Sequence, residues 1–239
     1  MYGYGFGYPG FYFDPTMILV LIGVVLSMLA SARVNSTYAK YSRVRSMTGM
    51  TGAEAAKRLL NDQGIYDVTV RRVAGNLTDH YDPRSRTVNL SESVYDSTSV
   101  AAIGVAAHEC GHAMQDAAEY LPMRLRGAIV PVVNIGAQIS WPMILIGFFI
   151  GGAGSTMVML GILLFSLSVL FQLVTLPVEF NASSRAVRLL DATGILRGDE
   201  VGYTRQVLGA AALTYVAAAA GSILQLLRLL ILFGGRRDD

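Results

Sequence analysis

Uncharged apolar stretches dominate the pattern of hydrophobic and polar positions along this chain. Residues 128–177 form a run of 50 positions without Asp, Glu, Lys, Arg or His. That length is enough for two membrane-spanning helices of about 20 residues each. A glycine-rich segment, residues 151–155, interrupts the run near its middle and predicts a tight turn between two antiparallel helices.

A second apolar run, residues 17–32, predicts another membrane-spanning helix near the amino terminus. The alternative is a cleaved signal peptide, because residues 30–32 have the small side chains of a cleavage site. A signal peptide needs a positive segment before its apolar run, and Asp14 is the only charge before Arg33. The sequence therefore favours a retained helix, with the aromatic residues 11–13 at the membrane interface.

Basic residues cluster beside these apolar runs and predict the orientation of the chain. The segment 33–45 carries four basic residues and no acidic one, and further arginine pairs lie at 124–126 and 185–188. By the positive-inside rule these segments face the cytoplasm, which places the amino terminus outside.

The composition supports a membrane protein and argues against other classes. Hydrophobic residues make up 53% of the 239 positions, and the mean hydropathy is +0.46. Both values are high for a soluble domain. A single cysteine excludes an internal disulfide framework. The net charge of +2, without a basic run interleaved with aromatic residues, argues against nucleic-acid binding.

The segment between the first two apolar runs predicts a small α+β domain. Residues 51–54 form a capping box that opens a short helix, and Gly64 ends that helix. Residues 66–73 are rich in β-forming side chains, and residues 77–90 have the pattern of a hairpin. A longer apolar helix follows over about residues 97–119.

An H-E-x-x-H pattern lies on this last helix, which is expected to end before Pro122. His108 and His112 stand four residues apart, so about 400° of rotation and about 6 Å of rise place both imidazoles on one face. Two histidines in this arrangement bind one metal ion, and Glu109 between them handles protons. Gly111 leaves the backbone open to close approach by another element. The alternative, two core histidines satisfied as polar groups, is disfavoured because an unpaired acid between them would be costly to bury.

A zinc ion held by two histidines needs a further protein ligand. The chain lacks the glycine and the third histidine that the metzincin pattern requires. His80 lies in the expected hairpin, where it is expected to face solvent or substrate rather than the metal. Asp116 lies about 12 Å along the helix from His108, which is too far for one tetrahedral ion. Glu179, directly after an apolar run, is the candidate third ligand; the alternative is an interfacial acid paired with an arginine such as Arg185.

The last apolar stretch, residues 207–233, has two interpretations. It is either a helix of the catalytic domain followed by an interfacial segment, or a further membrane span. A further span would export Arg236 and Arg237, so the positive-inside rule favours the first interpretation.

Four blocks of the chain together resemble a known family. They are Tyr81-Asp82-Pro83-Arg84, residues 99–115 with His-Glu-Cys-Gly-His-Ala-Met-Gln, residues 177–183 and residues 211–217. The combination is similar to the YugP-like neutral zinc metallopeptidases of bacterial membranes, over nearly the whole chain from residue 50 onward. The resemblance implies a zinc peptidase of the bacterial plasma (inner) membrane, distantly similar to HtpX-type proteases.

The resemblance also implies the roles of the site residues. One zinc ion would be held by the two motif histidines and Glu179, with Glu109 as the general base. Ser183 stands where the HtpX-type pattern has an acid, so a histidine must be oriented by another group. Asn181 stands where the YugP-like motif has Asp.

The expected architecture is an α-helical integral membrane protein with a small α+β zincin-like (gluzincin) catalytic domain. Three membrane-spanning helices are expected, or four if the last apolar stretch crosses the bilayer. The expected segments are residues 1–32 (aromatic segment and first span), 33–127 (catalytic domain), 128–177 (helical hairpin) and 178–239 (third ligand, domain helix and terminal apolar helix).

The expected reaction is metal-assisted hydrolysis of peptide bonds near the membrane. Tyr215, His80 and Arg185 are candidates for stabilising the charge that develops on the scissile carbonyl. The hairpin edge offers strand addition to unfolded or membrane-proximal protein segments, and lipid is the other expected partner.

Two other functions compete with this one. An intramembrane protease of the site-2 kind would draw its third ligand from a Leu-Asp-Gly sequence, and residues 190–192 lack the glycine. A non-catalytic membrane scaffold with a structural metal would have no use for Glu109 as a base.

Overall fold

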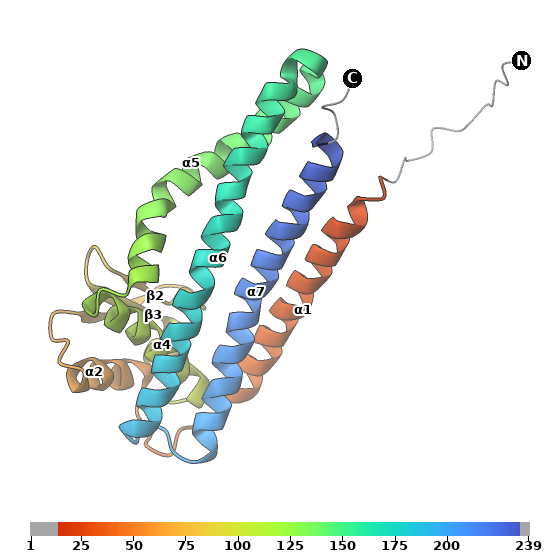
Figure 1. Cartoon of the computed structure of the whole chain (residues 1–239). Helices are drawn as coiled ribbons and strands as arrows, with labels where there is room; N and C mark the ends of the chain where they lie inside the picture. Colours follow the sequence, from red (N-terminus) through yellow and green to blue (C-terminus); the bar gives the residue numbers. More distant parts are fainter. Residues whose placement is uncertain (1–13, 235–239) are drawn as a thin grey trace, which may run out of the picture.

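The computed structural model describes residues 14–234 and is mostly helical (Figure 1). The aromatic residues 11–13 and Arg236 and Arg237, for which the sequence gives expectations, lie outside the described residues. The described helices are α1 (Met17–Tyr41), α2 (Gly52–Asp62), α3 (Glu92–Tyr95), α4 (Val100–Ala117), α5 (Leu121–Ile150), the 3-10 helix η1 (Gly151–Gly154), α6 (Ser155–Ala192) and α7 (Asp199–Phe233), with strands β1 (Thr69–Val73), β2 (His80–Asp82) and β3 (Thr87–Ser91).

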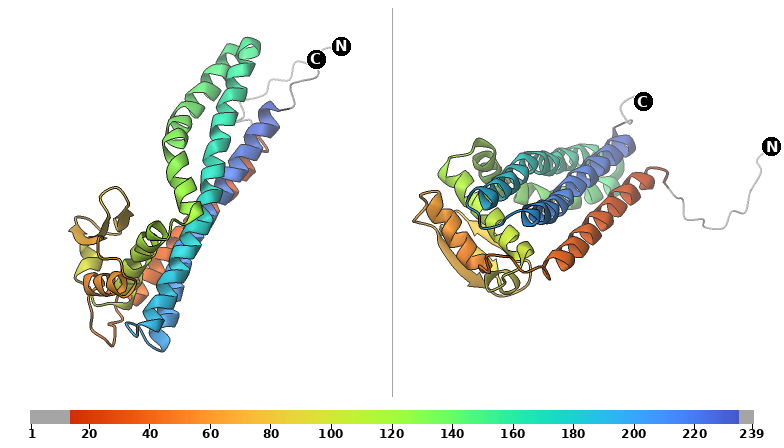
Figure 2. Two further views of the ribbon diagram at one scale, coloured as in Figure 1. Left: turned by 60° about the vertical axis from the view of Figure 1, so that its left-hand side comes forward. Right: turned by 90° about the horizontal axis from the view of Figure 1, so that it is seen from below.

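Four of these helices, α1, α5, α6 and α7, are long and apolar enough to cross a membrane. Helices α5 and α6 form one antiparallel pair and α1 and α7 another, with α7 also beside α6 (Figures 1 and 2). The expected turn within the charge-free run is confirmed, because α5 ends at Ile150 and α6 begins at Ser155. The two helices approach each other closely, since a Cβ on Gly161 of α6 would lie 2.9 Å from the Ser140 carbonyl oxygen of α5.

The expected division of residues 207–233 into two segments is wrong. Helix α7 runs without a break over 35 residues, because no proline interrupts it and its alanine-rich middle favours a helix. The far end of α7 lies beside the start of α1, where Arg228 Nη2 stands 3.3 Å from Asp14 Oδ2. By length and composition the structure therefore offers four candidate spans rather than three.

A small mixed sheet lies beside one end of the long helices, together with α2 and α4 (Figure 2). The strand order is β1-β3-β2, with β2 antiparallel and β1 parallel to β3. The expected hairpin is thus confirmed. The parallel pairing of β1 with β3 was not predicted, because the paired residues are not neighbours in the sequence. The capping box at Thr51 and Glu54 is also confirmed.

The end of α4 differs from the expectation. The helix ends at Ala117, and Glu119 follows with a φ of 50° that breaks the helical path. Pro122 does not stop α4; it lies in the first turn of α5, where its missing N–H costs no hydrogen bond.

The core of the small domain includes the nearby ends of α6 and α7. Val88 of the sheet, Ile103 of α4, Leu190 of α6 and Leu208 of α7 belong to one buried apolar cluster. Because these side chains share a core, the lower part of α6 is held at a fixed position against α4. This packing places residue 179 opposite the H-E-x-x-H motif.

Candidate metal centre

Helix α4 places the H-E-x-x-H motif inside the protein. Its amino end is capped by the Ser99 side chain, which accepts a hydrogen bond from the Ala102 N–H. The rings of His108 and His112 lie 4.8 Å apart between centroids, so the expected shared face is realised. Glu109 is 8% exposed and lines two cavities, one beside His108 and the other beside both histidines.

Gly111 allows α6 to approach α4 closely at this point. A Cβ added to Gly111 would lie 2.7 Å from the Ala182 carbonyl oxygen. The sequence predicted that this glycine would admit another element, and the element is the segment that follows Glu179. Any larger residue at position 111 would push α6 away from the motif.

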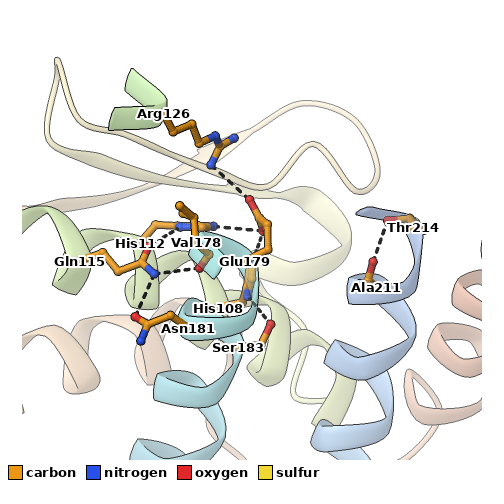
Figure 3. A network of polar contacts seen from close by, with 10 residues as sticks. All are labelled: His108, His112, Gln115, Arg126, Val178, Glu179, Asn181, Ser183, Ala211 and Thr214. Carbon is orange, nitrogen blue, oxygen red and sulfur yellow. Dashed lines mark hydrogen bonds and ion pairs between the residues drawn. The ribbon is translucent and has the colours of Figure 1, made fainter. Parts of the chain in front are cut away.

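Three side chains converge at the centre of this contact (Figure 3). Glu179 Oε2 lies 3.2 Å from His108 Nε2 and 3.6 Å from His112 Nε2. The three potential ligand atoms lie within 4.8 Å of one another, and all three side chains are buried or half-buried. Two imidazoles and one carboxylate are a donor set that suits zinc and leaves a coordination position for water.

A hydrogen-bond chain determines which nitrogen of His112 carries its proton. Arg185 Nε donates to Asn181 Oδ1 over 2.8 Å, which identifies that atom as oxygen. Gln115 Nε2 donates to Asn181 Oδ1 at 3.0 Å and to the Val178 carbonyl at 2.8 Å. The remaining Gln115 oxygen faces His112 Nδ1 at 3.0 Å, so Nδ1 must be the donor. In the neutral ring, His112 Nε2 is then the unprotonated nitrogen and can bind a metal.

Ser183 is the group that orients His108. Its hydroxyl lies 3.2 Å from His108 Nδ1, one turn beyond Glu179 on α6. A hydroxyl can accept the Nδ1 proton as a carboxylate would, although without a charge. The expectation that another group must orient the histidine is therefore wrong, because the serine that stands in place of the acid itself offers a hydrogen bond to His108.

Arg126 of α5 holds the other oxygen of Glu179. Its Nη1 donates to Glu179 Oε1 over 3.2 Å, while Oε2 faces the histidines. Glu179 is 2% exposed, so the ion pair compensates a charge that is largely buried. The sequence alone gave no indication of this contact, because 53 residues separate the two side chains.

Two cavities adjoin the three candidate ligand side chains. Both are lined by Asp79, His108, Glu109, Glu179 and Tyr215. The first, about 170 Å³, extends toward α7, and the second, about 310 Å³, extends toward α5 and the hairpin. The carboxylate of Glu109 therefore faces space in which a bound peptide and a water molecule can lie.

The other residues singled out in the sequence take different positions. His80 lines the larger cavity but is exposed, and its nitrogens contact the Thr78 carbonyl and Asn89. Arg185 is not among the residues that line either cavity. It holds Asn181 instead, so its position does not suit the expected role at a scissile carbonyl. Tyr215 lies at the cavities, as that role requires.

The surroundings of His112 and of Cys110, both on α4, affect the pKa of each side chain differently. Burial opposes a charge on His112, yet the neighbouring Glu179 and Glu109 outweigh it and raise the pKa of His112. The site thus attracts a cation. Burial raises the pKa of the Cys110 thiol, which faces the Ala56 carbonyl rather than the histidines. Cys110 is therefore an inert core residue.

Comparison with known proteins identifies the class of this protein. Residues 16–234 match the model of the family described as "Putative neutral zinc metallopeptidase". The chain therefore belongs to this family, whose description implies zinc. It is also 47% identical over 223 residues to the "Putative membrane protease YugP" of Bacillus subtilis, covering 93% of this chain and 98% of the relative. No solved structure matches the chain.

Proposed function

We propose that this protein is a membrane-embedded zinc metalloprotease that hydrolyses peptide bonds, with a zincin-like (gluzincin) catalytic domain. One zinc ion would be held by His108, His112 and Glu179. The observation that carries the proposal is the convergence of these three side chains beside Glu109 in an accessible cavity. The zinc peptidase family to which the chain belongs supports the same conclusion.

Zinc, when bound, supplies a Lewis acid that polarises a peptide carbonyl and lowers the pKa of a water molecule. The residues of this chain supply the rest. The Glu109 carboxylate accepts a proton from the attacking water and then donates it to the nitrogen of the leaving amine. Gln115 and Ser183 hold the imidazoles so that Nε2 of each faces Glu179. Tyr215, at the cavity wall, is the candidate donor to the carbonyl oxygen as negative charge develops there.

The substrates we propose are unfolded or membrane-proximal protein segments. Strand β2 lies at an edge of the described sheet, and Tyr81 at its middle lines the larger cavity. An extended peptide could therefore add to this edge and pass the site. His80 points its exposed ring to the same cavity and would contact the substrate.

We propose that the site faces the cytoplasm, at the surface of the plasma (inner) membrane. The segments 33–45, 124–126 and 185–188 carry basic residues and lie at the end of the helices where the small domain lies. Cysteine at Asp62, in a chain with Cys110 replaced by alanine, should resist an impermeant thiol reagent in intact cells. Cysteine at Gly152, at the opposite end, should react. The reverse labelling pattern would refute this orientation.

Glu109→Gln tests the enzymatic function directly. The substitution keeps the shape of the side chain but removes the proton acceptor, so casein cleavage should fall by at least about 10²-fold. Zinc content should stay at that of the unaltered protein, because Glu109 is not a ligand. Cleavage of casein by the Glu109→Gln protein at the full rate would exclude the proposed mechanism. Zinc retention without cleavage by either protein would favour a structural metal in a scaffold.

A further inference from the structure

The smaller catalytic cavity is closed on the side of α7. It has a volume of about 170 Å³, and its lining includes His108, Glu109 and Glu179 of the candidate site. Leu208 and Ala212 also line it, and they separate it from a groove between α6 and α7. Both side chains are almost fully buried. A cavity that begins at the site and ends at packed side chains suits a single side chain of a substrate rather than a continuing chain.

The polar side chains in the wall of this cavity have partners within the protein. The two carboxylate oxygens of Asp79 accept hydrogen bonds from the Ser91 N–H at 2.7 Å and from the Ser91 hydroxyl at 2.9 Å. The Ser183 hydroxyl and the Glu179 carboxylate face the ligand histidines. The two remaining polar residues of the wall have the catalytic roles proposed above. A charged or amide side chain in the cavity would therefore lose its contacts with water without replacing them.

The rest of the wall is apolar. Leu77, Val105 and Ala211 line the cavity together with Leu208 and Ala212. At about 30 Å³ for each water-sized group, the cavity holds roughly five such groups. The side chains of leucine, isoleucine and methionine match this size, whereas the indole of tryptophan exceeds it. The shape and chemistry of the cavity thus fit an aliphatic side chain.

Leu77 belongs to this wall in an unusual backbone conformation. Its φ is 56°, in the left-handed region that a leucine adopts only at a cost. The side chain is 50% exposed, on the loop between β1 and β2. This conformation keeps an apolar side chain at the cavity while leaving half of it open to contact. A strained residue beside a catalytic group suggests a role in function rather than in folding.

We propose that the smaller cavity binds the side chain of a residue directly beside the scissile bond. It would select leucine, isoleucine or methionine there through contact with Leu77, Val105 and Ala211. This inference rests on the proposed proteolytic function and names its substrate class, polypeptides with an aliphatic residue at the cleavage site. The larger cavity beside the hairpin, about 310 Å³, remains for the rest of the bound chain.

A series of quenched fluorescent peptides tests the preference itself. The peptides differ only in the two residues that flank the scissile bond. At one of these two positions, kcat/KM of the unaltered protein should be at least about 10-fold higher with leucine than with alanine, tryptophan, lysine or glutamate. A protein that cuts all of these peptides at the same rate would overturn the proposed selection.

Ala211→Leu and Ala218→Leu form a matched pair of variants on α7. Both alanines are half-buried and lie two turns apart on one face of the helix, but only Ala211 lines the cavity. The side chain added at position 211 should fill the cavity and lower the ratio of leucine to alanine cleavage at least about 10-fold. Ala218→Leu should leave this ratio within about 2-fold. An equal loss for every peptide in Ala211→Leu would indicate a structural effect and refute the proposal.

Leu77→Asn separates substrate contact from folding. Asparagine tolerates the left-handed region better than leucine, so the thermal unfolding midpoint in detergent should stay the same or rise. The ratio of leucine to alanine cleavage should nevertheless fall at least about 5-fold. Leu121→Asn is the control, because Leu121 is 75% exposed and lines neither cavity. A lower midpoint with an unchanged ratio in Leu77→Asn would show that Leu77 serves the fold alone.

Binding gives a measurement that does not depend on turnover. Fluorescence anisotropy of the labelled peptides with the Glu109→Gln protein should give the same order of preference, because an uncut side chain still occupies the cavity. Equal affinity for the leucine and tryptophan peptides would refute the binding of an aliphatic side chain.

Two results separate this inference from the proposed function. If the zinc-loaded unaltered protein cuts neither casein nor any peptide, the proposed protease function fails. If it cuts the peptides without preference at either flanking position, only the selection by the smaller cavity fails.

Discussion

The two halves of α6 show how one helix serves two purposes. The far half, residues 155–176, packs against α5 through glycine contacts and apolar side chains. A Cβ on Gly161, for example, would lie 2.6 Å from Ile144 Cγ1. The near half, residues 177–192, packs against α4 across Gly111 in the same way, but adds Glu179, Asn181 and Ser183 to the contact.

A displacement of α6 has different consequences in its far half and in its near half. In the far half the contacts are close packing of glycines and apolar side chains, so a small displacement costs packing energy. In the near half the same displacement moves a carboxylate that lies 3.2 Å from His108, so the packing of the helix also sets the geometry of the proposed metal site. Pro177 marks the boundary between the halves, where the helix lacks one backbone donor and a small bend costs little.

The largest expected difference between the halves comes from Glu179→Ala and Thr175→Val, one turn apart on α6. Glu179→Ala leaves two protein ligands, so zinc and casein cleavage should be lost together. Thr175 is buried in the far half, and its hydroxyl has no hydrogen-bond partner within the described residues. Thr175→Val should keep zinc, activity and stability. Zinc analysis of both purified proteins is the measurement; equal zinc in Glu179→Ala and the unaltered protein would exclude Glu179 as a ligand.

Gly111→Ala and Gly161→Ala sharpen the comparison further. Each added methyl group would meet its neighbour at less than 3 Å, so each should lower stability by about 1–3 kcal/mol. Only Gly111→Ala moves Glu179 away from the histidines, so we expect activity per folded molecule to fall about 10²-fold there. The Gly161→Ala protein should keep full activity below its unfolding temperature. Thermal unfolding in detergent, with activity measured in parallel, distinguishes the two outcomes.

The sequence pointed to the candidate metal ligands, which the structure brings together, but not to the residues that hold them in place. His108, Glu109 and His112 have a spacing that a helix turns into one face, and Glu179 stood out as an acid directly after an apolar run. The sequence did not identify Gln115 or Arg126 as part of the site. A glutamine or arginine beside the site cannot be told from one at the protein surface by its sequence alone. Their roles depend on contacts across 66 and 53 residues.

In the fold, too, features that depend on neighbouring residues were predicted better than features that depend on distant contacts. The capping box, the hairpin and the turn at residues 151–154 depend on neighbouring residues, and all three were predicted. The continuous α7 was missed because Arg236 and Arg237 favoured keeping the chain in the cytoplasm, whereas helix propensity and packing against α1 and α6 favour an unbroken helix.

Gln115→Leu tests the hydrogen-bond chain that reaches His112 from the near half of α6. Without the amide, Nδ1 loses its acceptor and the ring loses a fixed tautomer, so zinc affinity should fall about 10- to 100-fold. Asn181→Asp is the matched control, because its oxygen still accepts from Gln115 and Arg185. Its zinc affinity should stay within about 3-fold. Competition with a zinc chelator measures both, and a loss as large in Asn181→Asp as in Gln115→Leu would refute the chain.

The smallest expected difference concerns two arginines that each reach a carboxylate outside their own helix. Arg126 contacts Glu179 at 3.2 Å beside the near half of α6, and Arg228 contacts Asp14 at 3.3 Å at the opposite end. Arg126→Gln frees one oxygen of the ligand carboxylate, so turnover per bound zinc should fall about 10-fold while three zinc ligands remain. Arg228→Gln should leave turnover unchanged, since its ion pair is partly exposed and far from the site. Casein cleavage normalised to zinc content measures both variants. Equal losses in the two would mean that Arg126, like Arg228, serves stability and does not position Glu179.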